Sequence, residues 1–259
     1  MPRPDADLSR VELVATRFGA RAAHYDEHAL LQREAATCLA AFIEETGGLG
    51  PDLKSALVVE IGCGTGLLSE RLAPLAGRYL ATDIAPEMLE RCRQRLGQLP
   101  QASFAVADGE SVSFDELPAA IVSNLAAQWF TDPVAGLRRL AGYTACLAFA
   151  VPLAGSFPEW REAFLRMGRE PGLLPMPRAN EVLRALTGIP GTRTRFKTES
   201  HTLRYANARA FADSFRNIGA DQPKPGYRPG PIRPVLKHFA QGMEATAFVL
   251  YGVIRKEAA

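Results

Sequence analysis

The chain has 259 residues, of which 47% are hydrophobic and 22% are charged, and its formal net charge is +2. These values are ordinary for a globular protein with one sizeable domain, so the length does not require a second one. No apolar stretch reaches the length of a membrane span, and no internal repeat or low-complexity tract is present, which excludes membrane-spanning and repeat architectures.

The N-terminus and the cysteines both predict a cytoplasmic protein. Asp5, Asp7 and Glu12 do not fit the basic and then apolar order of a secretory signal peptide. The four cysteines are Cys38, Cys63, Cys92 and Cys146. They lie far apart, without a C-x-x-C pair or a nearby histidine, which favours reduced thiols and argues against zinc. We therefore expect no bound metal.

The first predicted elements are a helix over residues 30–43, with an amphipathic helical segment before it, and then a strand near 57–61. The unbroken run Leu57-Val58-Val59 is typical of a parallel strand that is buried on both faces. Gly62, Gly64 and Gly66 follow, and they permit a sharp turn without a Cβ that would block a ligand. A helix beginning near Leu67 would point its free N–H groups at that ligand.

The spacing of this glycine loop separates two classes of ligand. Dinucleotide sites use G-x-G-x-x-G, whereas the loop here reads G-x-G-x-G and follows an acid, Glu60. A carboxylate at that point would repel a pyrophosphate but would suit a cationic amino group. A carboxylate that closes an apolar strand is costly unless something pairs with it, and a ligand cation would do so.

The next two strands also end in acids. The strand over 78–83 ends at Asp83, near the spacing of about 20 residues at which an acid reaches a ribose. The strand over 102–107 ends at Asp108. Alternatively, Asp83 caps the helix that begins near Pro86, and Asp108 holds a turn.

This combination of a glycine loop and three strand-end acids resembles class I methyltransferases, which use S-adenosylmethionine (SAM). The resemblance implies SAM as cofactor and places the carboxylate of Asp108 at the adenine amino group. The implied cofactor-binding residues are Glu60, Gly62, Cys63, Gly64, Gly66, Asp83, Ile84, Met88, Asp108, Gly109 and Asn124. Cys63 is expected to be a small filler in the loop rather than a nucleophile.

The remaining pattern predicts an α/β fold with a doubly wound, Rossmann-like sheet of seven strands, one of them antiparallel, and helices on both faces. Further strands are expected near 119–123, 145–151, 196–205 and 245–254, and helices near 67–73, 86–96, 133–141, 157–167, 179–186 and 208–218. We expect a single domain over 1–259, with a helical cover over 1–45 and a helical lid over 155–190. The proline-rich segment 223–234 reads as a rigid surface connection.

Charge is distributed unevenly along the chain. Residues 1–154 carry 13 Lys or Arg against 19 Asp or Glu, whereas residues 155–240 carry 15 against 7, a net charge of +8. This asymmetry predicts an anionic partner for the second segment. The candidate basic residues are Arg161, Arg166, Arg169, Arg178, Arg184, Arg193, Arg195 and Lys197. Alternatively, these side chains are a solvated face; nucleic acid is disfavoured because stacking aromatics are sparse among them.

Several further segments resemble a narrower family, the malonyl-[acyl-carrier protein] O-methyltransferases of biotin synthesis. They are Phe18–Ala29 with Leu31-Gln32-Arg33, then Ser123–Trp129, Gly155–Glu159 and Arg216–Ala220. The resemblance spans roughly residues 17 to 255. Two turns depart from the family pattern, at 141–145 and at 116–118, and they leave room for an altered substrate.

The resemblance implies an enzyme that methylates the free carboxylate of a malonyl thioester on acyl-carrier protein. Such a carboxylate is ionised at neutral pH, so no general base is required, and catalysis is mainly a matter of positioning. The implied catalytic candidates are Tyr25, His24 and Gln128. Tyr25 is alternatively a core aromatic, and Trp129 is expected in the core. Other functions left open are methylation of a free small carboxylic acid, RNA methylation, and SAM binding without turnover.

Overall fold

A computed structural model describes residues 9–50, 53–224 and 226–257 of the chain. Its centre is a seven-stranded sheet in the order β3-β2-β1-β4-β5-β7-β6, in which β7 runs antiparallel to both neighbours. The strands are β1 (Leu57–Ile61), β2 (Arg78–Asp83), β3 (Ala102–Val106), β4 (Ala120–Asn124), β5 (Cys146–Pro152), β6 (Thr192–Tyr205) and β7 (Met243–Lys256). The expected seven-stranded sheet with one antiparallel member is confirmed.

The strand order reverses between β1 and β4, and this reversal positions a ligand site. From β1 the chain adds β2 and β3 on one side, and it then returns to place β4 and β5 on the other. The two crossovers leave in opposite directions, which opens a crevice at the carboxyl ends of β1 and β4. The glycine loop and the predicted strand-end acids all lie at this edge of the sheet.

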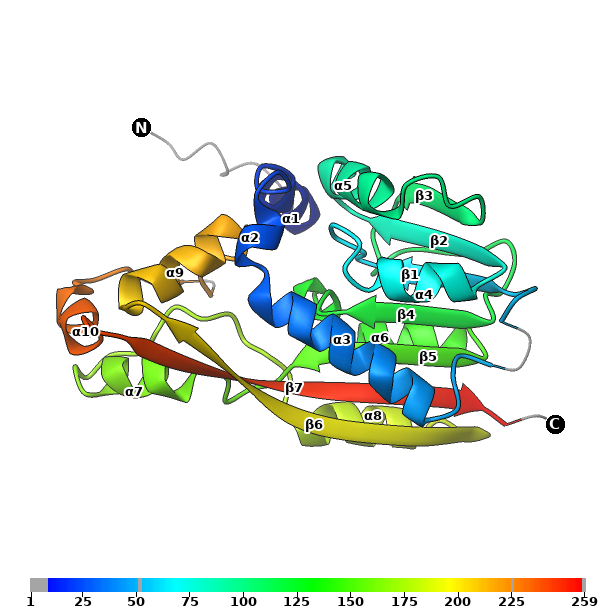
Figure 1. The fold of residues 1–259 in the computed structure, drawn as a ribbon. Helices are drawn as coiled ribbons and strands as arrows, with labels where there is room; N and C mark the ends of the chain where they lie inside the picture. Colours follow the sequence, from blue (N-terminus) through cyan, green and yellow to red (C-terminus); the bar gives the residue numbers. More distant parts are fainter. Residues whose placement is uncertain (1–8, 51–52, 225, 258–259) are drawn as a thin grey trace.

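Helices cover both faces of the sheet, as expected for parallel strands (Figure 1). The helices are α1 (Arg10–Gly19), α2 (Tyr25–His28), α3 (Leu30–Glu45), α4 (Ser69–Leu72), α5 (Pro86–Leu96), α6 (Pro133–Gly142), α7 (Pro158–Leu165), α8 (Ala179–Thr187), α9 (Ala208–Asn217) and α10 (Arg233–His238). One core forms between the sheet and α3, α4 and α5, and a second forms on the opposite face under α6 and α8. All seven residues of β5 are buried between them.

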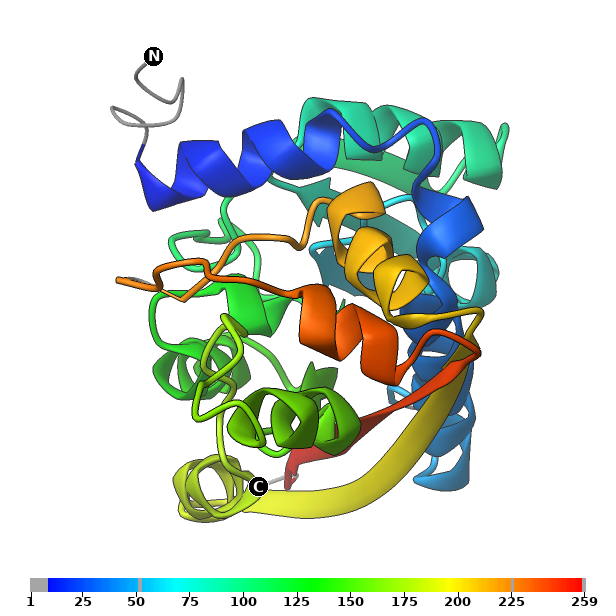
Figure 2. The same cartoon turned by 90° about the vertical axis from the view of Figure 1, so that its left-hand side faces the viewer.

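A third core lies beyond the carboxyl ends of the parallel strands, where α7, α9 and α10 gather around the ends of β6 and β7 (Figure 2). Phe211 is its centre, because its ring contacts those of Phe157, Trp160 and Phe215 at centroid distances of 5.1 to 5.4 Å. Both β6 and β7 have 14 residues and are longer than expected. The extra residues of β6, 192–195, lie at the other end from this core, and of the extra residues of β7 only Met243 belongs to it.

Three elements differ from the sequence-based expectation. The helix after the glycine loop begins at Ser69 rather than near Leu67, and it is short because the chain tightens into a 3₁₀ turn (Ala73–Leu75) that contains Pro74. Helix α10 lies partly within the proline-rich segment, with Pro234 in its first turn. Of the expected lid, α8 packs against α6 and β6 instead of lying over the strand ends. Residues 1–8 of the expected cover lie outside the described residues.

In the described part of the chain, no helix combines the length and the apolar composition that a membrane span requires.

Candidate active site

The glycine loop adopts a backbone that only glycine tolerates without strain. Gly62, Gly64 and Gly66 have φ angles of +68°, +54° and +90°. A Cβ on Gly62 would lie 2.3 Å from the Cβ of Ala126, so the approach of the loop to the end of β4 excludes any side chain. A Cβ on Gly66 would lie 2.9 Å from the sulfur of Cys92 on α5. Because Gly66 has no side chain, α5 can pack closely against the glycine loop.

A first cavity of about 970 Å³ lies at the carboxyl ends of β1, β2 and β4. Ten of the predicted cofactor-binding residues line it: Glu60, Gly62, Cys63, Gly64, Asp83, Ile84, Met88, Asp108, Gly109 and Asn124. Gly66 is the eleventh, and it does not line the cavity. Val14 and Phe18 of α1 line the opposite side, so α1 and α2 together form a roof over it.

Glu60 is buried beneath the loop, with 1% of its surface exposed. Its Oε2 accepts hydrogen bonds from the hydroxyls of Ser69 and Tyr79, the latter at 2.7 Å. Burial raises the pKa of Glu60 to about 7, although the two hydroxyls oppose the shift. The protein itself thus solvates one oxygen of this carboxylate, and the pairing of Glu60 with a ligand cation stays a prediction.

The other two acids hold the backbone around the first cavity. Asp83 accepts N–H bonds from Gly64 at 2.8 Å and Ala85 at 2.9 Å, and burial raises its pKa despite those bonds. Asp108 accepts the N–H of Glu110 and the hydroxyl of Ser111, both at 2.9 Å, so it does hold a turn. Each carboxylate oxygen has a second lone pair, which remains for a ligand hydroxyl or amino group.

Two buried amide oxygens have no hydrogen-bond partner among the residues that the structure describes. Asn124 donates to the carbonyl of Gln32 at 3.0 Å, and Gln128 donates to the carbonyl of Leu125 at 2.6 Å, which leaves Asn124 Oδ1 and Gln128 Oε1 unpaired. A buried acceptor without a donor is destabilising by roughly 1–3 kcal/mol, so both oxygens favour a ligand that donates. Asn124 lines the first cavity, where a hydrogen-bond donor of a bound ligand would satisfy its oxygen.

A second, larger cavity of about 1700 Å³ adjoins the first. Aromatic side chains dominate its wall, among them Phe157, Trp160, Phe164, Phe211, Phe215 and Tyr227. Five residues line both cavities: Phe18, Tyr25, Gln32, Leu125 and Trp129. Trp129, which the sequence places in the core, thus lies at the junction, with its ring 5.1 Å from that of Phe18.

The structure separates the three catalytic candidates. Tyr25 lies at the junction of the two cavities with 8% exposure, and burial together with the charge of Asp83 raises its pKa, so the phenol stays neutral. Gln128 lines only the second cavity. His24 lines neither cavity, because its side chain is 75% exposed and its Nδ1 lies 3.1 Å from Glu27. The fold therefore does not bring His24 to the site.

A polar clasp that the sequence does not reveal ties the roof to the glycine loop. Asp26 of α2 accepts the hydroxyl of Thr65 at 2.5 Å and also pairs with Arg95 of α5. Arg95 in turn contacts Glu70 at 2.9 Å and the carbonyl of Thr65 at 2.7 Å. The partners of Asp26 are 39 and 69 positions away in the chain, so no local pattern indicates them.

The basic residues of the second half do not form one patch. Arg161, Arg166 and Arg169 lie in or directly after α7, beside the second cavity. Arg161 donates to the carbonyl of Ser156 and Arg169 to that of Pro231, so both also support the backbone. Arg193, Arg195 and Lys197 instead lie on β6, where it pairs with the C-terminal end of β7.

Comparisons with known proteins agree with this geometry. Residues 58–144 match the family model described as a methyltransferase domain. A malonyl-[acyl-carrier protein] O-methyltransferase of Magnetococcus marinus is 33% identical over 252 residues, which cover 92% of this chain and 90% of that protein. The biotin biosynthesis bifunctional protein BioCD of Bordetella avium is 36% identical over 253 residues, or 94% of this chain, and the match spans 52% of that protein's length.

A solved structure shares the fold. The magnesium protoporphyrin IX methyltransferase ChlM of Synechocystis PCC 6803, crystallised with bound SAM, has a TM-score of 0.57 and 13% identity, with 97% of this chain and 99% of that chain covered. Fold, cavity and relatives lead to one conclusion: the chain belongs to the malonyl-[acyl-carrier protein] O-methyltransferase family and is a class I, SAM-dependent methyltransferase.

Proposed function

We propose that this enzyme methylates the free carboxylate of a malonyl group carried on acyl-carrier protein, in the cytoplasm, and so supplies a precursor for biotin. The observation that carries the proposal is the wall shared by two adjoining cavities, with Tyr25 at their junction: the glycine loop and the strand-end acids line the first, and mostly apolar side chains line the second. One cavity suits a cofactor and the other suits a long, largely uncharged acceptor arm. The relatives named for this substrate support the choice of acceptor.

The residues of the first cavity fit SAM in three parts. We assign Asp83 to the ribose hydroxyls and Asp108 to the adenine amino group, since each has free lone pairs. Glu60 and the unpaired Oδ1 of Asn124 would hold the cationic amino group. When bound, SAM supplies an electrophilic methyl group on a sulfonium.

The acceptor chemistry needs positioning and no proton transfer. A malonyl carboxylate has a pKa near 4 and is already ionised, so it could take the methyl group directly and no residue would have to remove a proton. The neutral hydroxyl of Tyr25 can donate to one carboxylate oxygen and leave the other oxygen aimed along the line of attack. In the part of the chain that the structure describes, no histidine lines either cavity, which agrees with a mechanism without a base.

The second cavity fits the arm that carries the acyl group. Acyl-carrier proteins present their cargo on a phosphopantetheine arm, which has amide N–H donors. Gln128 lines this cavity, and its buried Oε1 has no partner in the described part of the chain, so this oxygen suits one of those amides. The aromatic walls of the second cavity would exclude water from the reacting groups.

A mass-spectrometric assay of methyl transfer tests the proposal. Malonyl-carrier protein should gain one methyl group far faster than free malonate, and at saturation the chemical step should be nearly independent of pH from about 6 to 8. Tyr25→Phe should slow that step by roughly ten- to a hundredfold, as expected for the loss of one charged hydrogen bond. Tyr143→Phe, whose ring packs on Phe114 away from both cavities, is the matched control.

Equal rates with free malonate and with the carrier-linked substrate would contradict the assigned acceptor. A rate that falls tenfold per pH unit below 7 would instead indicate a general base and a different nucleophile.

A further inference from the structure

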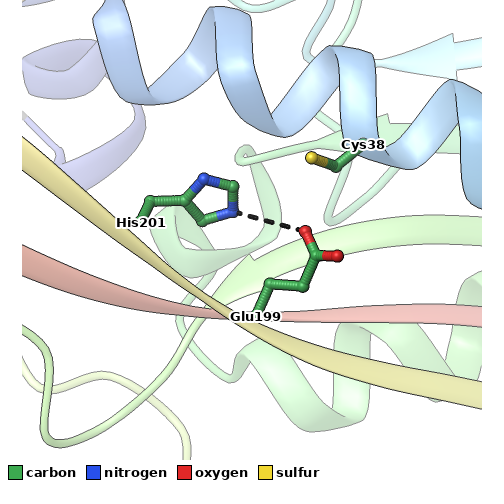
Figure 3. A group of neighbouring side chains, drawn as sticks. All are labelled: Cys38, Glu199 and His201. Carbon is green, nitrogen blue, oxygen red and sulfur yellow. Dashed lines mark ion pairs between the residues drawn. The ribbon is translucent and has the colours of Figure 1, made fainter.

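A cluster of metal-ligating side chains lies between α3 and the β6–β7 pair, outside both cavities. It consists of Cys38 on α3 with Glu199 and His201 on β6 (Figure 3). One ligand atom from each residue lies within 4.8 Å of the other two. Among the residues that the structure describes, no other group of three histidine, cysteine or acidic side chains meets this condition.

The two elements bring these groups together through their regular geometry. Glu34 and Cys38 are four residues apart on α3, and they therefore lie on one face of that helix. Glu199 and His201 are two residues apart on β6, so their side chains leave the same face of the strand. Tyr251 of β7 joins them, because it lies opposite Lys197 in the register of the two strands.

His201 is held in the orientation that a metal ligand needs. It is 7% exposed, and its Nδ1 lies 3.1 Å from the carboxylate of Glu34. The other nitrogen, Nε2, lies 3.9 Å from Glu199 Oε2 and 2.8 Å from the hydroxyl of Tyr251. A histidine that binds a metal through one nitrogen commonly donates its other N–H to a carboxylate, which is the part that Glu34 takes here.

We propose that Cys38, Glu199 and His201 bind a divalent, thiol-preferring cation such as Zn²⁺. A thiolate, an imidazole and a carboxylate together match the ligand preference of zinc, which bonds to them at about 2.0–2.3 Å. Small side-chain rotations close the remaining distance between the ligand atoms. Lys197 pairs with the other oxygen of Glu199, Oε1, at 2.7 Å and leaves Oε2 for the metal.

The hydroxyl of Tyr251 or a water molecule would be the fourth ligand of the metal. Metal binding would release the thiol proton of Cys38. The site has a structural role, because none of its three ligands lines either cavity. The metal would join the edge strand β6 to α3, the helix that follows the roof. The expectation of no zinc considered only neighbours in the sequence, whereas this cluster combines residues from distant segments.

Zinc affinity of the whole protein, measured against a chromophoric chelator, tests the site. The wild type should bind one equivalent, and Cys38→Ser or His201→Gln should weaken binding by at least about a hundredfold. Cys146→Ala and His238→Gln, which alter a buried cysteine and an exposed histidine elsewhere, should leave the affinity unchanged. Glu34→Gln should weaken it by about 10- to 100-fold, since Glu34 only orients His201.

Cobalt substitution gives a second readout that does not depend on activity. Co²⁺ should produce a thiolate-to-metal charge-transfer absorption in the wild type and in Glu34→Gln but not in Cys38→Ser. If His201→Gln proves unstable, Glu199→Gln replaces it, with circular dichroism in chelator to confirm the fold. The proposal is overturned if the wild type shows no stoichiometric binding, or if Cys38→Ser binds zinc and cobalt as the wild type does.

Discussion

At the scale of single residues, Glu60 is a buried carboxylate whose ionised form is destabilised by its surroundings. The carboxylate ends an apolar strand, and burial raises its pKa from 4.5 to about 7. Two hydroxyl donors lower the cost of the charge but do not remove it. A cation bound beside Glu60 in the first cavity would favour the ionised form of Glu60, so under the proposed assignment cofactor binding would be coupled to proton release at this residue.

The first prediction concerns the pH dependence of stability. Because folding raises the pKa of Glu60, the unfolded chain loses this proton first, and stability falls as the pH rises from about 4.5 to 7. The shift corresponds to about 3 kcal/mol, fully expressed above pH 7 and absent below 4.5. Denaturant unfolding of the ligand-free protein should show that Glu60→Gln gains stability relative to wild type by about this amount between pH 4.5 and 8.

Loss of the hydrogen bonds from Ser69 and Tyr79 adds an offset that does not depend on pH, so the slope is the diagnostic quantity. Glu116→Gln serves as the control, because Glu116 is exposed and its pKa is lowered by Arg78. A constant difference between wild type and Glu60→Gln across the pH range would show that Glu60 is ionised throughout.

At the scale of elements, the roof joins the main core through Ala22 and Tyr25 and is tied to the glycine loop by the clasp. Helix α1 begins at a capping box, in which Ser9 and Glu12 exchange hydrogen bonds, and its Val14 is buried over the first cavity. Helix α2 has only four residues and is anchored through Asp26. A ligand that crosses the roof to enter or leave the first cavity would have to displace it, so we expect the clasp to affect entry and release.

The second prediction tests this clasp. Asp26→Asn removes the charge that pairs with Arg95 and should speed SAM dissociation by roughly tenfold or more, as expected for a partly buried charged hydrogen bond worth about 1.5–3 kcal/mol. Stopped-flow displacement of SAM measures this rate. Arg93→Ala breaks an exposed pair with Glu90 on the same helix, α5, and should leave the rate unchanged. An equal dissociation rate in Asp26→Asn would show that the roof opens without breaking the clasp.

At the scale of the whole molecule, charge and cavities divide between the two halves of the chain. The acidic half supplies the glycine loop and the strand-end acids, whereas the basic half supplies most of the second cavity. We expect an anionic carrier protein to approach from the side of α7 and α9, which line the second cavity (Figure 2).

The third prediction tests which arginines contribute to binding of the carrier protein and which only support the fold. Arg166→Glu with Arg178→Glu, two exposed side chains, should slow association with carrier protein and flatten its salt dependence, while SAM affinity stays the same. Arg161 and Arg169 are unsuitable for reversal because they hold backbone carbonyls. The control reverses Arg193 and Arg195 on β6.

Association kinetics at low salt decide the outcome. If the two double reversals slow association equally, the effect is one of net charge and no docking face exists beside α7. If neither reversal changes the rate, these arginines form a solvated face, as the alternative interpretation holds.

The sequence by itself determined the strands, their ends and the family. Apolar runs such as 57–59 and 146–151 favour buried strands, and the positive φ angles of the loop favour glycine. These are local properties, because backbone geometry and side-chain period depend only on neighbours in the chain. The expected strands therefore agree with the structure to within a few residues at most ends.

Only the tertiary structure decided which distant groups meet. Asp26 reaches Arg95 across 69 positions, and Glu34 reaches His201 across 167. The second cavity combines side chains from Phe18 to Ile232, and His24 lies outside it although Tyr25, its neighbour, is at the junction. Such contacts follow from how helices pack on the sheet, and a shift of one residue along a helix turns a side chain by about 100°. Local patterns cannot specify that orientation, so it is fixed only when the layers close on one another.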